Sequence, residues 1–332
     1  MHRIRVGVLR GGPSSEYDVS LKTGASVIGC LPEEKYDVKD IFISKEGIWH
    51  RNGFPISLSD ALSHVDVIFN ALHGQYGEDG KVQHLLEMHN IPFTGSGAFA
   101  SSLGMNKVIS KDIFKKEKIK TPYHKIINKN SEEDKEKEIS PALLLELFRS
   151  FPLPIVVKPA SAGSSVGVAL VKNFDSFGGS IMNAFMHSDT VLIEEFIPGI
   201  EATVGVIDGY RDQDVYALPA IEIRPHINKG KSFFDYDAKY ANMSDEIVPG
   251  NFSSDEKEEL ENIAKRVHKI LGLKHYSRTD FIVNPKRGIY VLETNTLPGL
   301  TEESLIPKAL NAVGSNLAHF VEHVLTLALE RK

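Results

Sequence analysis

Residues 276–301, with the sequence YSRTDFIVNPKRGIYVLETNTLPGLT, decide how the last third of this chain folds. Two apolar runs, at residues 280–283 and 289–292, flank the segment NPKRG, whose turn-forming residues predict a hairpin. Such a hairpin brings Asp280 close to Glu293. Residues two apart on a strand share a face, so Arg278 lies beside Asp280 and Asn295 beside Glu293. The stretch therefore predicts a cluster of one arginine, two carboxylates and one amide.

This cluster has the chemistry of a magnesium-phosphate site. Magnesium prefers oxygen ligands in an octahedron, often one or two carboxylates together with substrate phosphates, and Asp280, Glu293 and Asn295 provide such a set. The alternative is a solvated hairpin face with an ordinary salt bridge, which is the commoner case for an arbitrary hairpin. Here, however, polar residues interrupt strongly apolar strands and lead directly into Pro298 and Gly299. We therefore favour the site.

Length and composition limit the classes of protein to be considered. A chain of 332 residues can hold two or three domains, and its net charge of -6 argues against nucleic acid or an anionic membrane as a partner. The single cysteine, Cys30, fits a reducing compartment. The first apolar run stops at Leu9, too early for a signal peptide, and no run approaches the length of a membrane span. We expect a cytoplasmic protein.

The first hundred residues alternate between apolar runs and helical patterns. Strands are expected at residues 4–9, 38–43, 65–71 and 91–94, and helices from Val19 and over 78–89. Strands that alternate with helices indicate a small parallel sheet. This predicts a first domain at residues 1–104.

The rest of the chain predicts two further domains, at residues 105–201 and 202–332. In the first, a helix at 141–149 and strands at 155–158, 166–171 and 191–196 indicate a mixed sheet crossed by a helix, and the charged segment 128–138 is read as a surface excursion. In the second, strands at 202–207 and 216–223 and a loop at 224–249 precede the hairpin, and Ser253 with Glu256 forms a capping box. The fold class is α/β, with α+β character in the last two domains.

The segment 158–167, KPASAGSSVG, joins two of the predicted strands through small residues. Such a loop can bring backbone N–H groups close to phosphate oxygens. Lys158 begins the loop and would supply a positive charge to those phosphates, and Lys107 is a second candidate. The alternative is an ordinary turn, because glycine and serine fill many of these. The magnesium ligands favour the phosphate loop.

Four ordered motifs resemble those of the D-alanine–D-alanine ligases of the ATP-grasp superfamily. They are GGxSxExxVS at residues 11–20, HGxxGEDG at 73–80, the loop that begins at Lys158, and residues 278–299. The resemblance covers residues 4–325. It implies a small N-terminal parallel-sheet domain followed by two ATP-grasp domains, with ATP between the middle and last domains.

The resemblance also implies which residues bind the nucleotide and metal. Glu194 would accept the adenine amino group and Glu201 the ribose hydroxyls. The phosphates would be bound by Lys107, Lys158, Ser164 and Ser165, and the adenine ring would be lined by Glu195 and by the backbone of Phe196 and Ile197. Asp280, Glu293 and Asn295 would hold two Mg²⁺ ions, for which Mn²⁺ is a substitute. Without the resemblance, residues 192–197 are better read as a buried strand with an exposed acidic end.

Substrate roles follow from the same resemblance. Glu16 would pair with the ammonium group of the first D-alanine, and His73 would lie near its carboxylate. The second D-alanine's carboxylate would be bound by Ser304, by the backbone of Leu305 and by Lys239. Ser164 and Tyr240 would hydrogen-bond toward Glu16, and Arg278 with the backbone N–H of Gly299 would stabilise the oxyanion. Read singly, Glu16 could be an exposed loop acid, Ser304 a helix N-cap and His73 a structural residue.

The chemistry implied by the resemblance is carboxylate activation followed by attack of an amine. The first D-alanine would attack the γ-phosphate of ATP and become an acyl phosphate, which the amine of the second D-alanine attacks. Aromatic residues beside lysine in the segment 231–240 suggest a lid that excludes water. In the family, tyrosine at the position of Tyr240 accompanies dipeptide formation, whereas phenylalanine accompanies the D-lactate ester. The expected product is D-alanyl-D-alanine for peptidoglycan precursor synthesis.

Two alternatives remain open from the sequence. One is an ATP-grasp ligase with another acceptor, such as D-lactate, in which the nucleotide and metal residues would be the same. The other is a catalytically idle nucleotide-binding protein, which would be expected to have lost a metal ligand or Arg278, and neither is lost. The expected partners are D-alanine and ATP, and relatives in the family are commonly homodimers.

Overall fold

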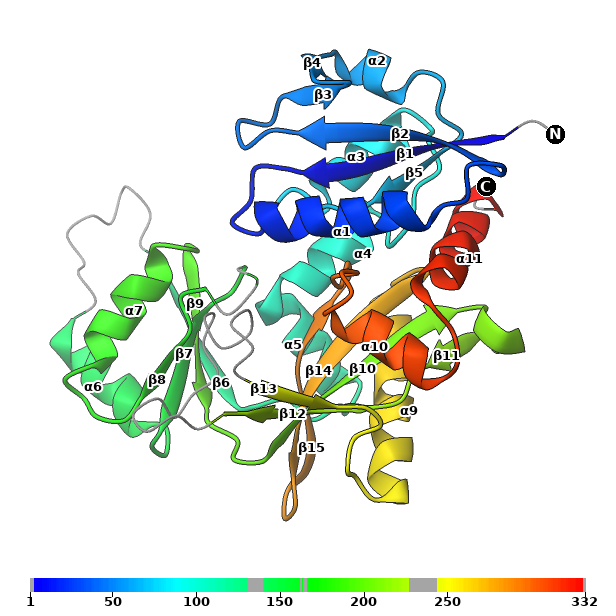
Figure 1. Ribbon diagram of the computed structural model, residues 1–332. Coiled ribbons are helices and arrows are strands. Elements are labelled where there is room, and N and C mark those ends of the chain that lie inside the picture. The colour runs from blue at the N-terminus through cyan, green and yellow to red at the C-terminus, as the bar shows by residue number, and fades with distance from the viewer. Residues whose placement is uncertain (1–2, 130–139, 162, 164–165, 227–243, 331–332) are drawn as a thin grey trace.

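The computed structural model describes residues 3–129, 140–161, 163, 166–226 and 244–330 (Figure 1). Within these ranges the strands form three sheets, and each sheet is built from one stretch of the chain. None of the helices in these ranges is both long and apolar enough to cross a lipid bilayer.

The N-terminal sheet has five strands in the order β4-β3-β2-β1-β5. Its central strand β1 runs parallel to β2 and β5, as expected. The elements are β1 (Ile4–Gly11), α1 (Tyr17–Cys30), β2 (Tyr36–Ile43), β3 (Trp49–Arg51), β4 (Phe54–Pro55), α2 (Leu58–Leu62), β5 (Val67–Asn70), α3 (Lys81–Met88) and α4 (Ala98–Met105).

Two expectations for this sheet were wrong. The sheet is mixed rather than parallel, because β3 and β4 add antiparallel strands at its edge. Asn52 and Gly53 join β3 to β4 with φ angles of 53° and 81°, the conformation of a tight hairpin turn. The strand expected at residues 91–94 is reduced to a single bridge between Ile68 and Phe93, since Pro92 has no N–H to extend the pairing.

The central sheet has four strands in the order β6-β9-β7-β8, and one apolar cluster lies between it and the helices α6 and α7. Its three pairings are all antiparallel, so the mixed sheet that we expected here is also wrong. The elements are α5 (Lys107–Lys116), β6 (His124–Asn128), α6 (Pro141–Arg149), β7 (Ile155–Pro159), β8 (Ala169–Val171), α7 (Phe177–Phe185) and β9 (Thr190–Glu195).

The C-terminal sheet has six strands, in the order β13-β12-β10-β14-β15 with β11 beside β10. The predicted hairpin is confirmed as β14 and β15, and the capping box of Ser253 and Glu256 begins α9. The elements are β10 (Ile200–Asp208), η2 (Tyr210–Asp212), β11 (Val215–Ala217), β12 (Ile221–Pro225), β13 (Ser244–Ile247), α9 (Ser254–Ile270), β14 (Tyr276–Asn284), β15 (Gly288–Asn295), α10 (Leu305–Ala312) and α11 (Leu317–Glu330).

The strand expected at residues 216–223 is two strands, β11 and β12. Pro219 separates them, and they pair with opposite ends of β10. Proline cannot donate to a strand ladder, so the continuous apolar run does not form one strand. β13 also lies within the stretch that we expected to be a loop.

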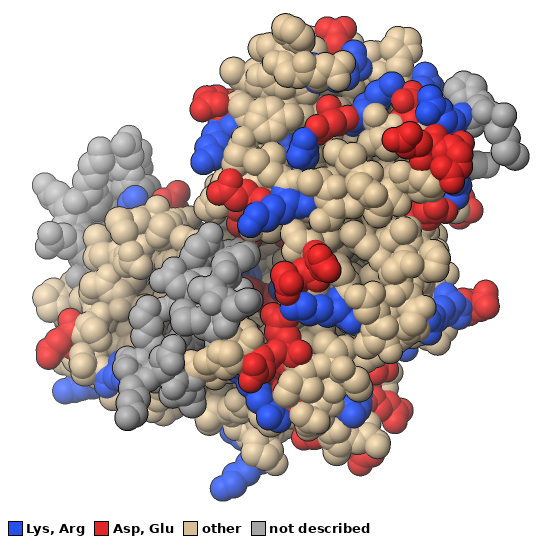
Figure 2. Space-filling model, in the orientation of Figure 1, with Lys and Arg blue, Asp and Glu red and all other residues tan. Residues whose placement is uncertain are grey.

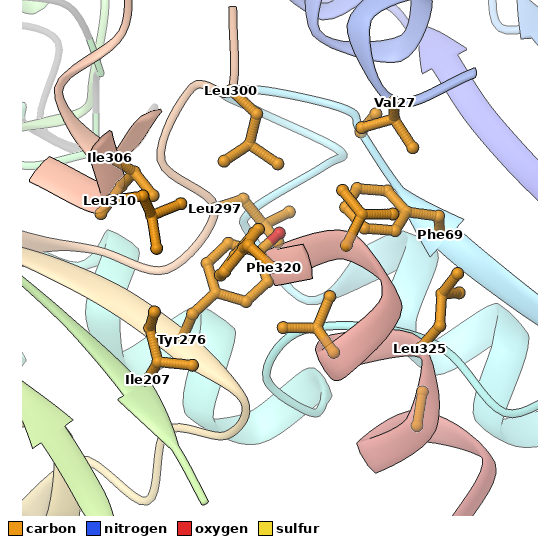
Figure 3. Close-up of a cluster of buried hydrophobic side chains, with 14 of the residues drawn as sticks. Val27, Phe69, Ile207, Tyr276, Leu297, Leu300, Ile306, Leu310, Phe320 and Leu325 are labelled. Carbon is orange, nitrogen blue, oxygen red and sulfur yellow. The ribbon is translucent and has the colours of Figure 1, made fainter. Parts of the chain in front are cut away.

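The N-terminal and C-terminal parts share one hydrophobic core (Figure 3). It contains Phe69 from β5, Val27 from α1, Leu297 after β15 and Phe320 from α11, all buried. Helices α4 and α5 pack against β15, so residues 98–116 connect the first sheet with the last (Figure 1). The domain limits at residues 104 and 201 stay a prediction.

Candidate active site

A cavity of about 900 Å³ lies where the N-terminal part, α5 and the C-terminal sheet meet. Figure 2 shows acidic and basic side chains gathered where the upper and lower parts of the molecule meet. The cavity brings together many of the predicted site residues from distant parts of the sequence. These are Glu16, His73, Lys107, Glu201, Arg278, Asp280, Glu293, Asn295, Gly299, Ser304 and Leu305.

The hairpin forms one wall of this cavity. Arg278 faces Asn295 across the strands and Asp280 faces Glu293, with a bulge directly after Asp280. The guanidinium of Arg278 donates from Nε to Oδ1 of Asp280 at 2.9 Å and from Nη2 to Oδ2 at 3.0 Å. Thr203 on β10 donates to the same Oδ1 at 2.6 Å. The carboxylate of Asp280 is therefore held in a fixed orientation.

The other members of the predicted metal set lie on the same wall. Nζ of Lys107 lies 3.1 Å from Oε2 of Glu293, and Oδ1 of Asn295 accepts the N–H of Leu297 at 3.0 Å. No group of three or more His, Cys, Asp and Glu side chains in the described part of the chain could hold a metal ion. This set instead combines two carboxylates with an amide. Lys107 pairs with Glu293 and Arg278 pairs with Asp280. Carboxylate and amide oxygens of this kind are the ligands that Mg²⁺ prefers.

Glu16 and His73 lie on the N-terminal side of the cavity, and Ser14 connects them. Its hydroxyl donates to the carbonyl of His73 at 2.7 Å and accepts the N–H of Glu16 at 2.9 Å. Nε2 of His73 lies 2.8 Å from Oγ1 of Thr23, and His73 is buried. The loops that follow β1 and β5 thus hold both residues at one end of the parallel strands, where such folds bind ligands.

Two glycines approach the carboxylate of Glu16 closely. A Cβ atom at Gly74, or one at Gly163, would lie 2.6 Å from Oε2 of Glu16. Gly163 belongs to the predicted phosphate loop, so this residue of the loop lies beside the N-terminal part. A larger residue at either position would displace the Glu16 side chain.

Ser304, which also lines the cavity, precedes α10. Its hydroxyl accepts the N–H of Thr301 at 3.1 Å and makes no cap hydrogen bond to the helix, although Ser304 holds the N-cap position. Leu305 is the first residue of α10, so its N–H belongs to the unpaired first turn. Free N–H groups at a helix N-terminus favour a carboxylate.

A buried group of charges adjoins this cavity on the central sheet. Glu194 on β9 lies between Lys158, with Nζ 2.9 Å from its Oε2, and Lys111, with Nζ 3.0 Å from its Oε1. Burial acts to raise the pKa of Glu194, but the two ammonium groups outweigh it and the pKa is lowered. Burial lowers the pKa of Lys111 to about 8, although Glu194 opposes the shift.

Lys111 is the residue that the sequence reasoning missed. It is fully buried on α5, four residues after Lys107, and the i, i+4 spacing places both lysines on one face of the helix. A lysine at this spacing from a predicted phosphate ligand was the signal that could have identified it.

The remaining predicted nucleotide residues lie near the end of β9. Glu195 pairs with Arg287 at 2.9 Å and accepts the N–H of Tyr123 at 3.0 Å. Phe196 is half-buried and Ile197 is buried. Lys158, Glu194, Glu195, Phe196 and Ile197 are not among the residues that line the cavity.

Four predicted site residues lie outside the described residues: Ser164, Ser165, Lys239 and Tyr240. The predicted lid at residues 231–240 and nearly all of the charged segment 128–138 lie outside them as well. Their predicted roles stay predictions.

Family models and full-length relatives agree on one family. Residues 113–326 match the model described as D-ala D-ala ligase C-terminus, and residues 5–57 and 50–96 match D-ala D-ala ligase N-terminus. The chain is 38% identical to the D-alanine–D-alanine ligase of Geotalea uraniireducens (strain Rf4), over 98% of this chain and 95% of that protein. It is 37% identical to that of Syntrophotalea carbinolica (strain DSM 2380 / NBRC 103641 / GraBd1), over 99% and 97%.

Solved structures of similar fold include two ligases with different second substrates in their names. The D-alanine–D-alanine ligase from Bacillus anthracis has a TM-score of 0.81 and 34% identity, covering 98% of both chains. The VanG D-Ala:D-Ser ligase from Enterococcus faecalis has a TM-score of 0.84 and 26% identity, covering 98% of this chain and 100% of that one. By its sequence over nearly its whole length and by its ATP-grasp fold, the chain belongs to the D-alanine–D-alanine ligase family.

Proposed function

We propose that this protein joins two molecules of D-alanine to form D-alanyl-D-alanine, with conversion of ATP to ADP and phosphate, for peptidoglycan precursor synthesis. The observation that carries the proposal is one cavity lined by Glu16 and His73 on one side, Arg278, Asp280 and Glu293 on another. Groups that can bind an ammonium ion, an oxyanion and a metal ion thus line the same cavity. Relatives that align with nearly the whole chain are named D-alanine–D-alanine ligases.

The first D-alanine binds at the N-terminal side of the cavity. The carboxylate of Glu16 pairs with its ammonium group, and this holds its carboxylate toward the hairpin. The absence of a Cβ at Gly74 and Gly163 leaves space for Oε2 of Glu16, because a Cβ at either position would lie only 2.6 Å from that oxygen. Holding reacting groups in a fixed orientation can lower the activation barrier by about 7 kcal/mol in well-oriented cases.

ATP is expected near the buried charges of the central sheet. Glu194 accepts the adenine amino group, Glu201 the ribose hydroxyls, and Lys107 and Lys158 the phosphates. Asp280, Glu293 and Asn295 would hold two Mg²⁺ ions, for which Mn²⁺ would be a substitute. When bound, the metal neutralises the charge of the crowded phosphate oxygens.

Ligation proceeds in two steps. A carboxylate oxygen of the first D-alanine attacks the γ-phosphorus of ATP, the bond to the ADP oxygen breaks, and an acyl phosphate forms. The deprotonated amine of the second D-alanine then attacks the carbonyl carbon, and phosphate leaves with the C–O bond electrons. Arg278 and the backbone N–H of Gly299 stabilise the oxyanion between these events.

The second D-alanine binds at the N-terminus of α10. Ser304 and the N–H of Leu305 take its carboxylate, and the family resemblance adds Lys239 as a further ligand and Ser164 with Tyr240 as partners of Glu16. An alternative acceptor is the second candidate, because a D-Ala:D-Ser ligase is among the structures of similar fold. The nucleotide and metal residues do not distinguish the two, so the acceptor must be measured.

The decisive assay is release of ADP from ATP and Mg²⁺, with and without D-alanine. We expect release to depend on D-alanine and to be accompanied by the dipeptide. Turnover that is independent of D-alanine would contradict the proposal. Offering D-lactate, D-serine and L-alanine beside D-alanine then defines the acceptor and its stereochemistry.

We also propose that the protein acts as a homodimer, as the family resemblance implies, and that it lies in the cytoplasm, a reducing compartment that its single cysteine fits. Sedimentation equilibrium at micromolar concentration would test the dimer. A single species of monomer mass would contradict it.

A further inference from the structure

Two buried lysines share the carboxylate of Glu194. One carboxylate lies 2.9 Å from the ammonium group of Lys158 and 3.0 Å from that of Lys111. The side chain of Lys111 is 0% exposed and that of Lys158 is 9% exposed. The two lysines therefore share one close carboxylate, with Glu293 as a smaller electrostatic contribution at Lys111, and burying an incompletely matched charge is costly.

The two lysines differ in their positions relative to the nucleotide. Lys158 is the second-last residue of β7 and the first of the segment 158–167, whose small residues suit phosphate oxygens. Lys111 lies in the middle of α5, and its Nζ donates to Oγ1 of Thr121 at 2.6 Å. Of the two lysines, only Lys158 belongs to the predicted phosphate loop. Lys111 is held between Glu194 and a neutral hydroxyl.

We infer that Lys111 is a positioning residue that holds the Glu194 carboxylate ionised and oriented for the base of ATP, so that Lys158 serves the phosphates. This inference rests on the nucleotide site in the proposed function. When the ammonium of Lys158 turns to a phosphate, Glu194 loses one of its two counter-ions. Without Lys111, a buried carboxylate would take up a proton or turn away from the base.

The charge state of Glu194 determines which purine it accepts. An ionised carboxylate only accepts hydrogen bonds, so it pairs with the 6-amino group of adenine and repels the 6-oxo group of hypoxanthine. A protonated carboxyl group can donate to a 6-oxo group. A site with a fixed acceptor rejects a ligand that cannot pair with it, because a buried polar group is left unsatisfied. Lys111 therefore sets the preference for ATP over ITP.

The test compares Lys111→Met with Lys111→Arg, and with Lys116→Met as a matched control on an exposed position of the same helix. We expect Lys111→Met to raise the KM for ATP by about tenfold or more and to lower the ratio of kcat/KM for ATP to that for ITP by a similar factor. The KM for D-alanine should not change. Lys111→Arg should restore much of the ratio, and Lys116→Met should match the wild type.

A purely structural role for Lys111 predicts something different. It would lower the melting temperature and the activity with both nucleotides equally, leaving the ratio unchanged, and that result would overturn the inference. If Lys111→Met does not fold, Lys111→Met combined with Glu194→Gln removes both charges of the buried pair. A double variant that keeps the wild-type ATP to ITP ratio would equally overturn it.

Nucleotide binding separates this inference from the proposed ligation. Calorimetric titration of the wild type and Lys111→Met with ATP and with ITP needs no D-alanine. A loss of ATP preference on binding would support Lys111 even if the protein used another acceptor. If the wild type and Lys111→Met preferred ATP over ITP by the same factor, the role of Lys111 would be overturned. The ligation assay would not be affected by that result.

Discussion

At the scale of single residues, the hairpin holds ionic groups in geometries that surface salt bridges rarely keep. Arg278 makes a two-point hydrogen bond to Asp280, and Thr203 adds a third bond to the same carboxylate. Two-point pairing of arginine with a carboxylate is directional as well as strong. The side chain of Asp280 is 10% exposed, so breaking this set would leave a buried charge.

Glu293→Gln should abolish turnover while leaving the fold intact. The amide keeps the size of the side chain but removes the negative charge that a divalent ion needs, so we expect kcat to fall about a hundredfold or more. ADP release measures the loss, and circular dichroism on heating checks the fold.

Glu258→Gln, on the exposed side of α9, is the matched control for this substitution. It should leave kcat and the melting temperature unchanged. Near-normal turnover in Glu293→Gln would contradict the metal assignment.

At the scale of elements, α9 illustrates how local sequence stabilises one helix. The hydroxyl of Ser253 accepts the N–H of Glu256 at 3.2 Å, and Oε2 of Glu256 accepts the N–H of Ser253 at 2.8 Å. One face of the helix then buries Leu260, Ala264 and Val267 against the sheet. This helix supports β10 and β14, which carry Thr203 and the hairpin.

Ser253→Ala should lower the free energy of unfolding by about 1 kcal/mol, because the first turn of α9 loses its cap. Urea denaturation followed by circular dichroism measures the change. The neighbouring Ser254→Ala serves as control and should have a smaller effect. Kinetic constants should stay unchanged in both variants, and a large loss of kcat in Ser253→Ala would show that α9 does more than support the sheet.

Asp208, the last residue of β10, contacts α9 and the residue before β14, and it makes the stability of the fold depend on pH. Oδ1 lies 3.1 Å from Nε2 of His268 on α9, and Oδ2 accepts the N–H of His275 at 2.6 Å. Burial acts to raise the pKa of Asp208, but the bond from His268 and the N–H of His275 outweigh it, so the pKa is lowered from 3.8. The carboxylate is therefore more strongly favoured in the folded protein than in the unfolded one.

Because the folded pKa of Asp208 is lower, its contribution to stability is complete above about pH 4 and is lost as the pH falls through the folded value. Asp208→Asn should remove this contribution, so its unfolding free energy should fall less steeply than that of the wild type below pH 4. Urea titrations at pH 7, 5, 4 and 3 measure the two slopes. Parallel slopes would contradict the assignment.

At the scale of the whole molecule, one core connects the first and last parts of the chain. The rings of Tyr276 on β14 and Phe320 on α11 meet edge to face with centroids 5.1 Å apart (Figure 3). Phe69 of the N-terminal sheet lies in the same cluster, and α11 packs against α1 and β5. The two walls of the substrate cavity are therefore fixed relative to each other by apolar contacts.

Phe320→Ala should lower the free energy of unfolding by about 3–5 kcal/mol, because it opens a cavity in this shared core. Chemical denaturation measures this change in the free energy of unfolding. Phe54→Ala is the control, since Phe54 is 73% exposed and should cost little. A small effect of Phe320→Ala would mean that the N-terminal part is held in place by other contacts.

The sequence by itself determined the hairpin, the capping box and the four motifs, because turn residues, alternation along strands and cap spacing all act within a few residues. The expectations that failed involve neighbours along a sheet: the added antiparallel strands β3 and β4, the break at Pro219 and the antiparallel central sheet. The pairing and direction of strands depend on contacts between segments that are far apart in the chain, and the pattern of a single sequence does not reveal these contacts.

Only the tertiary structure placed Lys111 against Glu194, eighty-three positions later in the chain, and brought Glu16 and His73 to the wall opposite Arg278. It also put α11 and the first sheet into one core. The physical reason is that local propensity fixes the elements, whereas burial of apolar faces between elements decides which distant charges meet.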